Sequence, residues 1–486
     1  MNRRMVLYML GRIVQLEAIL LLLPMVCSIF FGEGITAFLI TIAIALGFGT
    51  LLTAFGKTKN TTIFAKEGFA IVALAWIVMS AIGALPFYIS GEISSYTDAF
   101  FETVSGFTTT GASILPNVEI VSKGLMFWRS FTHWIGGMGV LVLVMAILPT
   151  DSGRSIYIMR AEMPGPIVGK LVPKIRSTAK ILYLIYISLT ILQIILLLFG
   201  GMPIYDSLIH TFGTAGTGGF GIKADSIAGY SPYLQWVITI FMLVFGTNFN
   251  LYYLILIRKI KSVIKSEELW TYIIIVFCAV VAITLNIYNR VECAATMSES
   301  LRHAAFQVSS IITTTGYATV DFNMWPGLSK TILLLLMFVG SCAGSTGGGF
   351  KVSRLVLLFK QIRANLKHML HSRSVEAIRF EGKTVEGQTA SGVMAYLGVY
   401  VLCFVVIVLI LGFDVFDLET NISAAAACFN NVGPGFGSVG PTSCYAAYSH
   451  ISKWTLSAAM LLGRLEIYPM LLLFSPYIWI KSRKGK

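Results

Sequence analysis

The residues of this chain whose types and spacing point to chemistry form four short loops rich in threonine and glycine. Carbonyl groups of such loops can replace the hydration shell of a monovalent cation, because glycine reaches backbone angles that turn carbonyls toward an axis and leaves the lumen open. We align the loops on the third residue of each, which is Gly111, Gly219, Gly316 and Gly435. The candidate coordinating residues are Thr109, Thr110, Gly111, Thr217, Gly218, Gly219, Thr314, Thr315, Gly316, Val432, Gly433, Pro434 and Gly435. Because proline lacks an N–H and stiffens the backbone, we expect the fourth loop to depart most from fourfold coordination.

A second candidate feature is the run of glycine and small residues over Gly340–Gly349, inside an apolar segment. Each glycine weakens a helix by up to about 1 kcal/mol relative to alanine. We therefore expect an unwound loop at mid-membrane depth, directly below the four loops. A phosphate-binding loop is the alternative, but Phe350 stands where that motif requires lysine.

Arg464 lies in a largely apolar segment, where a charge is costly and usually faces a cavity or a partner. A pair with Glu466 is the alternative, but residues two apart lie on different faces of a helix. We therefore expect Arg464 to face the pore, as an electrostatic barrier beneath the loops that also tethers the Gly340–Gly349 segment.

Four other polar residues in apolar segments are weaker candidates. Arg129 lies near the outer end of its segment, where a long side chain can reach the interface. For Glu17, a packing role, a dimer contact and an ion-related role stay open. We interpret His133 and His210 as helix residues with satisfied hydrogen bonds. The sequence contains no metal-ligand cluster, nucleophile triad or dinucleotide motif, so we do not expect an enzyme.

Each loop follows a segment that is too short to cross a bilayer and that begins with the acidic or hydroxyl residues typical of helix N-termini. These short segments are Asp98–Thr108, Tyr205–Gly216, Glu299–Thr313 and Glu419–Val432. An outer helix precedes each one, at about Gly68–Ser90, Lys180–Gly200, Leu269–Asn289 and Ser391–Gly412. An inner helix follows each loop, at about Gly124–Leu148, Pro232–Ile257, Lys330–Lys360 and Lys453–Ile480.

These units predict an all-α polytopic membrane protein. Irregular backbone at membrane depth is tolerated only where it lines water or is buried in protein, so four re-entrant loops favour a pseudo-fourfold arrangement around one pore. Inverted repeats of broken helices, as in secondary transporters, are the alternative, but these units all keep one orientation. We divide the chain into two N-terminal transmembrane helices (1–67) and four pore repeats, at 68–150, 151–265, 266–387 (with the interrupted inner helix) and 388–486.

Composition supports this class. Only 12% of the residues are charged and 56% are hydrophobic, whereas soluble domains carry about 25% charged residues. We expect ten spans. Most of the 36 Lys and Arg residues fall in segments 1–4, 56–67, 150–180, 258–268, 351–387 and the tail from 481. The positive-inside rule places these segments, and both termini, in the cytoplasm. The net charge of +13 therefore indicates orientation and not a nucleic-acid partner. The seven cysteines predict no disulfide framework, and pairing of Cys428 with Cys444 stays open.

The four loops, together with the segments His133–Gly139, Gly344–Lys351 and Gly463–Glu466, resemble the Trk/Ktr/HKT superfamily of potassium transporters. The two extra N-terminal helices make the chain similar to its Trk-type membrane subunit. The resemblance implies K+ as the transported ion, with no organic cofactor, and uptake through the plasma membrane by a homodimer with one pore per protomer. It also implies a cytosolic TrkA-like ring of nucleotide-binding regulatory subunits, and an intramembrane gate at Gly344, Ser345, Thr346, Gly347, Gly348, Gly349, Lys351 and Arg464. Gly111 stands where sodium-permeable plant members carry serine, which favours potassium.

Two alternatives stay open at this point. The basic segments Arg154–Lys180 and Lys351–Lys383 are suited to anionic membrane lipids, or to docking of the regulatory ring, which only the resemblance favours. A proton- or sodium-coupled potassium symporter using the same pore is the alternative function, although no relay of buried carboxylates is evident. A membrane enzyme or receptor is disfavoured because no catalytic constellation is present.

Overall fold

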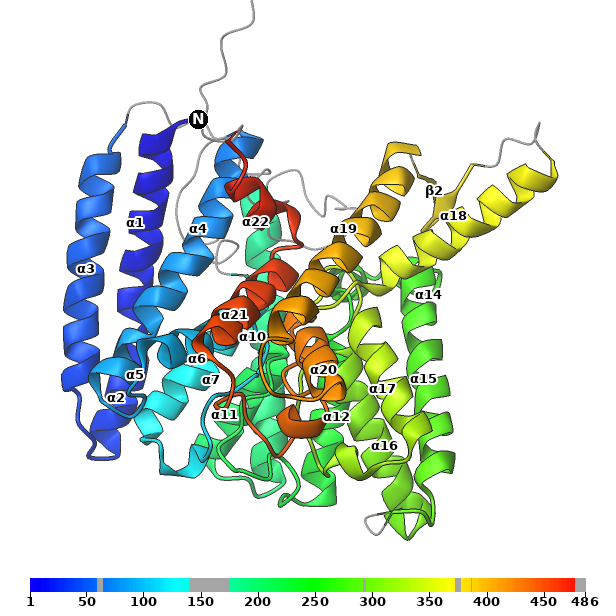
Figure 1. The fold of residues 1–486 in the computed structure, drawn as a ribbon, viewed down its shortest axis with the longest axis horizontal. Coiled ribbons are helices and arrows are strands. Elements are labelled where there is room, and N and C mark those ends of the chain that lie inside the picture. The colour runs from blue at the N-terminus through cyan, green and yellow to red at the C-terminus, as the bar shows by residue number, and fades with distance from the viewer. Residues whose placement is uncertain (59–63, 140–174, 292–293, 372–376, 386, 477–486) are drawn as a thin grey trace, which may run out of the picture.

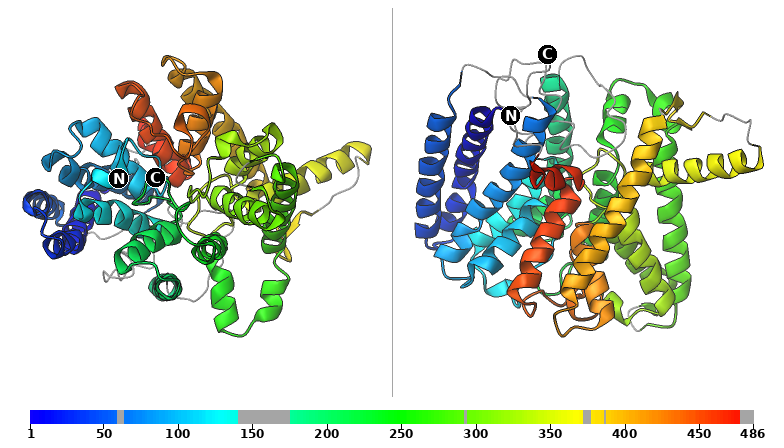
Figure 2. Two further views of the ribbon diagram at one scale, coloured as in Figure 1. Left: turned by 90° about the horizontal axis from the view of Figure 1, so that it is seen from below. Right: turned by 45° about the horizontal axis from the view of Figure 1, so that its top comes forward.

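The computed structural model describes residues 1–58, 64–139, 175–291, 294–371, 377–385 and 387–476. The regular secondary structure of this part of the chain is helical, apart from one antiparallel hairpin of two short strands, β1 (Arg379–Phe380) and β2 (Lys383–Thr384). The helices stand roughly side by side, with the N-terminal ones at one flank and α18 (Val352–Leu370) projecting from the opposite flank (Figure 1, Figure 2).

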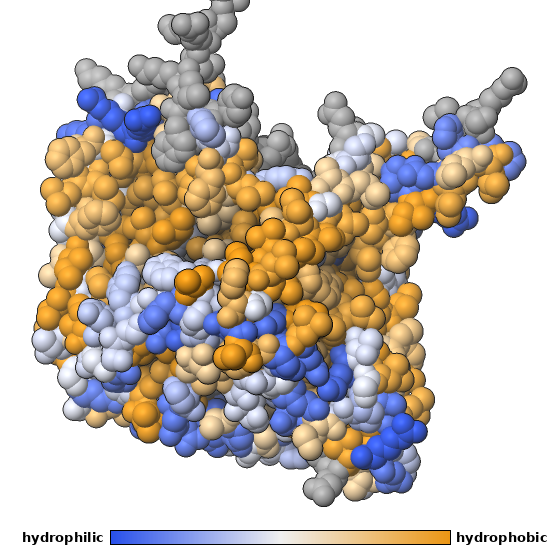
Figure 3. Space-filling model, in the orientation of Figure 1, coloured by the Kyte–Doolittle hydropathy of each residue, from blue (hydrophilic) through white to orange (hydrophobic). Residues whose placement is uncertain are grey.

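Six helical segments of the described chain are long and apolar enough to span a membrane, and a seventh joins them if one bent pair is taken as a single span. They include α1 (Arg3–Leu20) continued by α2 (Leu22–Phe30), α3 (Thr36–Gly56), and α4 (Ala65–Gly83) continued by α5 (Leu85–Ile89). The others are α10 (Ile175–Phe199), α15 (Glu267–Ile287) and α19 (Gly387–Leu411). Figure 3 shows a broad apolar band across one face, with hydrophilic residues along its lower edge. This arrangement is that of a multi-pass membrane protein, as the sequence predicts.

The N-terminal helices α1 and α3 approach each other through glycine. A Cβ atom placed on Gly11 would lie 2.7 Å from the carbonyl oxygen of Gly49, and one placed on Gly56 would lie 2.3 Å from the backbone nitrogen of Tyr8. Small residues at such crossings let two backbones come close in a membrane, where van der Waals packing holds helices together.

The four predicted short helices are present. They are α6 (Tyr96–Phe107), α11 (Ile204–Gly216), α16 (Met297–Ile312) and α20 (Leu418–Phe429). Each carries an acidic residue in its first turn, namely Asp98, Asp206, Glu299 and Glu419. A carboxylate there offsets the positive end of the helix dipole, and in α16 Glu299 and Thr296 form a capping box.

Three inner helices are interrupted, whereas the sequence predicts an interruption only in the third. The second is broken between α12 (Pro232–Phe245) and α13 (Phe249–Leu256), which are bent by 90°. The third is broken between α17 (Gly327–Val339) and α18, where the interruption is predicted. The fourth is broken between α21 (His450–Arg464) and α22 (Tyr468–Leu473).

The breaks persist because neighbouring segments satisfy the backbone groups that they release. In the second inner helix, the carbonyl oxygen of Gly246 accepts a hydrogen bond from the backbone N–H of Cys342 (3.1 Å), which lies in the third. The first inner helix, α7 (Lys123–Gly137), is described only to Gly139. The predicted end of that helix at Leu148, the basic segment from Arg154 and the predicted helix end at Ile480 lie outside the described residues.

Candidate functional site

The four loops share one backbone conformation. A residue in the left-handed region is followed two residues later by a glycine that also has positive φ. The first positions are Thr109 (φ 55°), Thr217 (57°), Thr314 (59°) and Asn431 (57°). The glycines are Gly111 (φ 81°), Gly219 (73°), Gly316 (84°) and Gly433 (99°). L-residues other than glycine, asparagine and aspartate rarely adopt this region, so the repetition identifies four equivalent positions.

The same glycines connect the loops into a closed cycle. A Cβ atom on Gly111 would lie 1.9 Å from the carbonyl oxygen of Gly218, and one on Gly219 would lie 2.0 Å from that of Thr315. A Cβ atom on Gly316 would lie 2.2 Å from the carbonyl oxygen of Val432, and one on Gly433 would lie 2.6 Å from that of Thr110. Each glycine therefore packs against the middle carbonyl of the next loop, and the fourth packs against the first.

This geometry corrects the alignment of the fourth loop. The equivalent glycine is Gly433, whereas Gly435 has no positive φ and packs on the side chain of Ser423. Asn431 occupies the position of the threonines. Asn431 does not stand out in the sequence because the pattern Thr-x-Gly is absent there. The signal that identifies it is an asparagine two residues before a glycine, since asparagine tolerates left-handed backbone.

Hydroxyl groups of two loops are engaged close to the backbone. Thr110 Oγ1 lies 2.8 Å from Thr108 Oγ1, and Thr315 Oγ1 lies 2.8 Å from Thr313 Oγ1. The Asn431 amide donates to Thr110 Oγ1 (3.0 Å), which joins the fourth loop to the first behind the cycle. These bonds engage the hydroxyls of Thr110 and Thr315, whereas the Thr109 hydroxyl has no partner among the described residues. The backbone carbonyls of the loops are available to coordinate an ion.

A cavity of about 210 Å³ lies on one side of the cycle. All four equivalent glycines line it, together with Arg129, Lys223 and the segment Val439–Tyr445. Cys444 is part of this lining, whereas Cys428 is buried, and both are free thiols. The loops therefore open on one side into a polar cavity.

The position of Arg129 also differs from the sequence prediction, because its side chain is buried and does not extend to a membrane interface. The side chain forms an ion pair with Glu102 of α6, with Nε 2.6 Å from Oε1. Glu102 also accepts hydrogen bonds from the Ser113 hydroxyl (2.9 Å) and the Ile114 N–H (2.9 Å), just after the first loop. The guanidinium donates to the carbonyl oxygen of Gly221 (3.2 Å), just after the second loop. The pair therefore connects two adjacent loops from behind.

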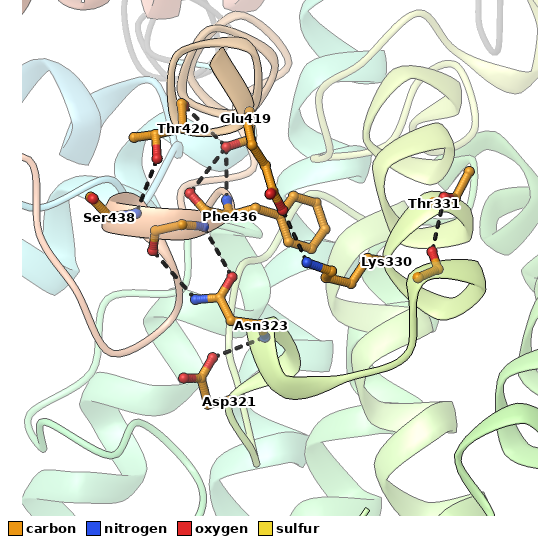
Figure 4. Close-up of polar contacts among 11 residues, drawn as sticks. Asp321, Asn323, Lys330, Thr331, Glu419, Thr420, Phe436 and Ser438 are labelled. Carbon is orange, nitrogen blue, oxygen red and sulfur yellow. Dashed lines mark hydrogen bonds and ion pairs between the residues drawn. The ribbon is translucent and has the colours of Figure 1, made fainter. Parts of the chain in front are cut away.

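The fourth loop is attached to the third repeat by a comparable set of bonds (Figure 4). Asn323 accepts from the Gly437 N–H (3.1 Å) and donates to the Gly437 carbonyl (3.4 Å). Nearby, the Lys330 ammonium lies 3.0 Å from Glu419 Oε1 at the surface. The exits of the second and fourth loops are thus held by side chains of a neighbouring repeat.

His133 and His210 are buried, and each makes one hydrogen bond, but the second ring nitrogen of each has no partner among the described residues, so the expectation of satisfied histidines holds only in part. His133 Nδ1 lies 2.7 Å from the carbonyl oxygen of Gly106, and His210 Nε2 lies 3.2 Å from the hydroxyl of Tyr230. Burial, and then the hydrogen bond to Asp206, raise the pKa of Tyr230.

The segment Gly340–Lys351 packs directly against the third and fourth loops, where the short helices α16 and α20 end. The backbone N–H of Gly348 donates to Thr314 Oγ1 (2.7 Å). A Cβ atom on Gly347 would lie 2.7 Å from the carbonyl oxygen of Thr313, and one on Gly348 would lie 2.4 Å from that of Asn430. Only glycine fits so close to the base of the loops, so the predicted unwound segment has the predicted position.

Arg464 joins this segment to the first repeat. Its guanidinium donates to the carbonyl oxygens of Thr346 (2.6 Å), Gly136 (2.5 Å) and Gly137 (2.7 Å). The ammonium of Lys351 donates to the carbonyl oxygen of Gly347 within the segment itself. The space between these groups is small, because the cavity that they help to line measures about 40 Å³.

Glu466 forms an ion pair with Arg354 of α18. Glu17 is fully buried, and neither carboxylate oxygen has a hydrogen-bond partner among the described residues. A Cβ atom on Gly83 would lie 3.1 Å from Glu17 Oε1, so this carboxylate packs on α4.

Comparisons with known proteins agree with this geometry. The family model described as "TrkH: Cation transport protein" matches residues 34–480. The Trk system potassium uptake protein TrkH of Salmonella typhimurium is 37% identical and covers 99% of this chain and 100% of its own length. The Trk system potassium uptake protein TrkG of Escherichia coli is 34% identical over 98% of each chain. The crystal structure of the potassium transporter TrkH from Vibrio parahaemolyticus superposes with a TM-score of 0.88, with 32% identity, and covers 99% of this chain and 100% of that one.

Proposed function

The chain belongs to the TrkH family of cation transport proteins, and from that premise we propose that it takes up potassium ions across the plasma membrane. The family is one of transporters, which confirms the expectation that this protein is not an enzyme. The observation that carries the proposal is the closed cycle in which four glycines pack against four backbone carbonyls.

The cycle acts as a selectivity filter. Its residues are Thr109–Gly111, Thr217–Gly219, Thr314–Gly316 and Asn431–Gly433. Carbonyl oxygens of these loops replace the hydration shell of K+, and the short helices direct the negative ends of their dipoles toward it. Two N-terminal helices (1–67) stand outside four repeats, 68–150, 151–265, 266–387 and 388–486, which surround one pore in pseudo-fourfold fashion.

The segment Gly344–Gly349, with Lys351 and Arg464, acts as the gate. Support comes from its contacts with Thr314 Oγ1 and from the three carbonyls that Arg464 holds below the filter. In this conformation, the gate occupies the ion pathway between the filter and the cytoplasm, so it has to move before ions pass.

Assembly and control follow from the family. We propose a homodimer, with both termini in the cytoplasm, that binds a cytosolic TrkA-like nucleotide-binding ring. The projecting helix α18 favours such contacts, because apolar residues such as Phe359, Met369 and Leu370 are exposed on it beside basic residues such as Arg363 and Lys367. Basic residues elsewhere on the cytoplasmic side contact anionic lipid headgroups.

Uptake of rubidium by purified protein in liposomes tests the proposal. We expect uptake down the rubidium gradient alone, competition by external potassium, and weak competition by sodium. Uptake that requires an imposed proton or sodium gradient would replace the channel-like mechanism with a coupled symporter. Equal competition by sodium and potassium would refute a potassium-selective filter.

A further inference from the structure

One buried carboxylate touches the gate segment from a helix outside the filter. Glu268 lies in the first turn of α15 and is 5% exposed. Its Oε1 atom accepts hydrogen bonds from the backbone N–H groups of Ala343 (2.6 Å) and Ser353 (3.2 Å). From the sequence alone, Glu268 is only the last residue of the predicted cytoplasmic segment 258–268.

These two N–H groups lie on either side of the gate. Ala343 directly precedes Gly344, and Ser353 lies in the first turn of α18, which begins at Val352. The first N–H groups of a helix have no partner inside it, and a carboxylate there also offsets the positive end of the dipole. Because one oxygen atom binds both ends, the loop between them stays folded back. It cannot extend while both bonds remain.

A second carboxylate braces the first from the cytoplasmic hairpin. Glu381 lies in the turn between β1 and β2, and its Oε1 atom accepts from the Ser266 hydroxyl (2.9 Å) and from the backbone N–H of Glu268 (3.1 Å). The hairpin is also attached to α18, since Lys360 donates to the carbonyl oxygen of Arg379 (2.7 Å). Four hydrogen bonds through the two carboxylates therefore link the hairpin to the gate segment.

The region beside these bonds is open. A crevice of about 760 Å³ lies between the hairpin and the helices α13 and α14 (Ile260–Ile264), and Glu268, Ala343 and Ser353 line it together with Glu381. The bonds that hold the gate are therefore next to solvent-accessible space, on the side of the molecule where α18 projects.

We propose that Glu268 is a positioning residue that holds the gate segment closed, and that Glu381 braces it, so that displacement of the hairpin favours opening. This inference rests on the proposed function, because it assumes that Gly344–Gly349 is the gate. Glu268 acts through the backbone at the two ends of the segment.

The test is single-channel recording of full-length protein in bilayers, without a regulatory subunit. A charge-assisted hydrogen bond contributes enough that its loss shifts a two-state equilibrium about 10-fold. We expect Glu268→Gln to raise open probability about 10-fold, with unitary conductance and the potassium-to-sodium permeability ratio unchanged. Glu268→Asp is expected to restore part of the closed state. A residue that only stabilises the fold would not change open probability alone.

Glu33→Gln is the matched control. Glu33 also accepts two backbone N–H groups at a helix N-terminus, those of Lys123 (2.7 Å) and Gly124 (2.9 Å), but it lies far from the gate in the sequence and contacts none of its residues. We expect it to leave open probability unchanged. Glu381→Gln is expected to raise open probability about 3-fold, and to add nothing to Glu268→Gln, because Glu381 acts through Glu268.

The outcomes separate the inference from the function beneath it. If Arg464→Ala raises open probability and Glu268→Gln does not, the role of Glu268 is refuted, whereas the assignment of Gly344–Gly349 as the gate is retained. If neither does, the gate assignment itself is refuted. Should Glu268→Gln not yield folded protein, Glu381→Gln carries the test, and an unchanged open probability in that variant overturns the inference.

Discussion

The alignment of the fourth loop leads to a specific prediction, because either Gly433 or Gly435 could be the glycine equivalent to Gly111, Gly219 and Gly316. Gly433 has φ 99°, and a Cβ atom there would lie 2.6 Å from the carbonyl oxygen of Thr110. Gly435 has no positive φ, and a Cβ atom there would lie 2.8 Å from Ser423 Oγ, outside the cycle. The change to alanine at each position therefore disturbs different structures.

For Gly433→Ala, two costs add. An unfavourable backbone conformation costs roughly 1–3 kcal/mol for a residue with a Cβ atom. The new Cβ atom must also separate from the Thr110 oxygen by about 0.8 Å to reach an ordinary contact distance of about 3.4 Å. The loop relieves both costs by moving that carbonyl off the cycle. An energy of about 1.4 kcal/mol corresponds to a factor of ten, so we expect the potassium-to-sodium permeability ratio to fall at least about 10-fold.

The assay is the reversal potential of reconstituted protein under bi-ionic potassium and sodium, with thermal unfolding measured on the same preparations. Gly435→Ala is the contrasting variant. It crowds Ser423 and lowers stability by roughly 1–3 kcal/mol as overpacking does, but it retains the wild-type permeability ratio. The reverse pattern, with discrimination lost in Gly435→Ala and kept in Gly433→Ala, would restore the alignment on Gly435 and refute the equivalence of the four glycines.

Three further predictions concern charged side chains. Arg464→Ala removes three hydrogen bonds that hold the gate and is expected to raise rubidium flux in liposomes; lower or unchanged flux per folded protein would contradict this role. Glu102→Gln leaves Arg129 buried beside a neutral partner, so we expect it to destabilise the protein by roughly 3–5 kcal/mol and to reduce potassium selectivity. A double-mutant cycle of Glu102→Gln with Arg129→Met is expected to give a strong coupling energy. Lys330→Ala breaks a pair with the largely exposed Glu419 and is expected to change stability by less than about 1 kcal/mol, and a larger loss in thermal unfolding would show that this contact is more than a surface ion pair.

Features with a local cause were predictable from the sequence. The short helices begin at acidic residues and end at glycine-rich loops, and both signals lie within a few residues of the structure that they specify. The interruption of the third inner helix was equally clear, since few helices tolerate so many glycines as Gly340–Gly349 contains.

Features that depend on distant partners were not predictable. Gly433 differs from Gly435 in its backbone φ and in its contact with Thr110, which lies more than three hundred residues earlier in the chain. The break after α12 needs the N–H of Cys342, and the burial of Arg129 needs Glu102 on the preceding helix. The positions of these residues are set by contacts with segments that are distant in the sequence.

The contact between the first and last filter loops also bears on how the protein is made. Thr110 meets Gly433 and Asn431, and Arg464 reaches back to Gly136 and Gly137, so the cycle closes only between segments at opposite ends of the chain. Synthesis proceeds from the N-terminus. A chain that is still on the ribosome therefore holds three loops without the fourth, and it has neither a complete filter nor the arginine of the gate. Under the proposed function, the filter and the gate are therefore completed together when the fourth repeat is made, so a shorter nascent chain has no assembled pathway through which the membrane could leak.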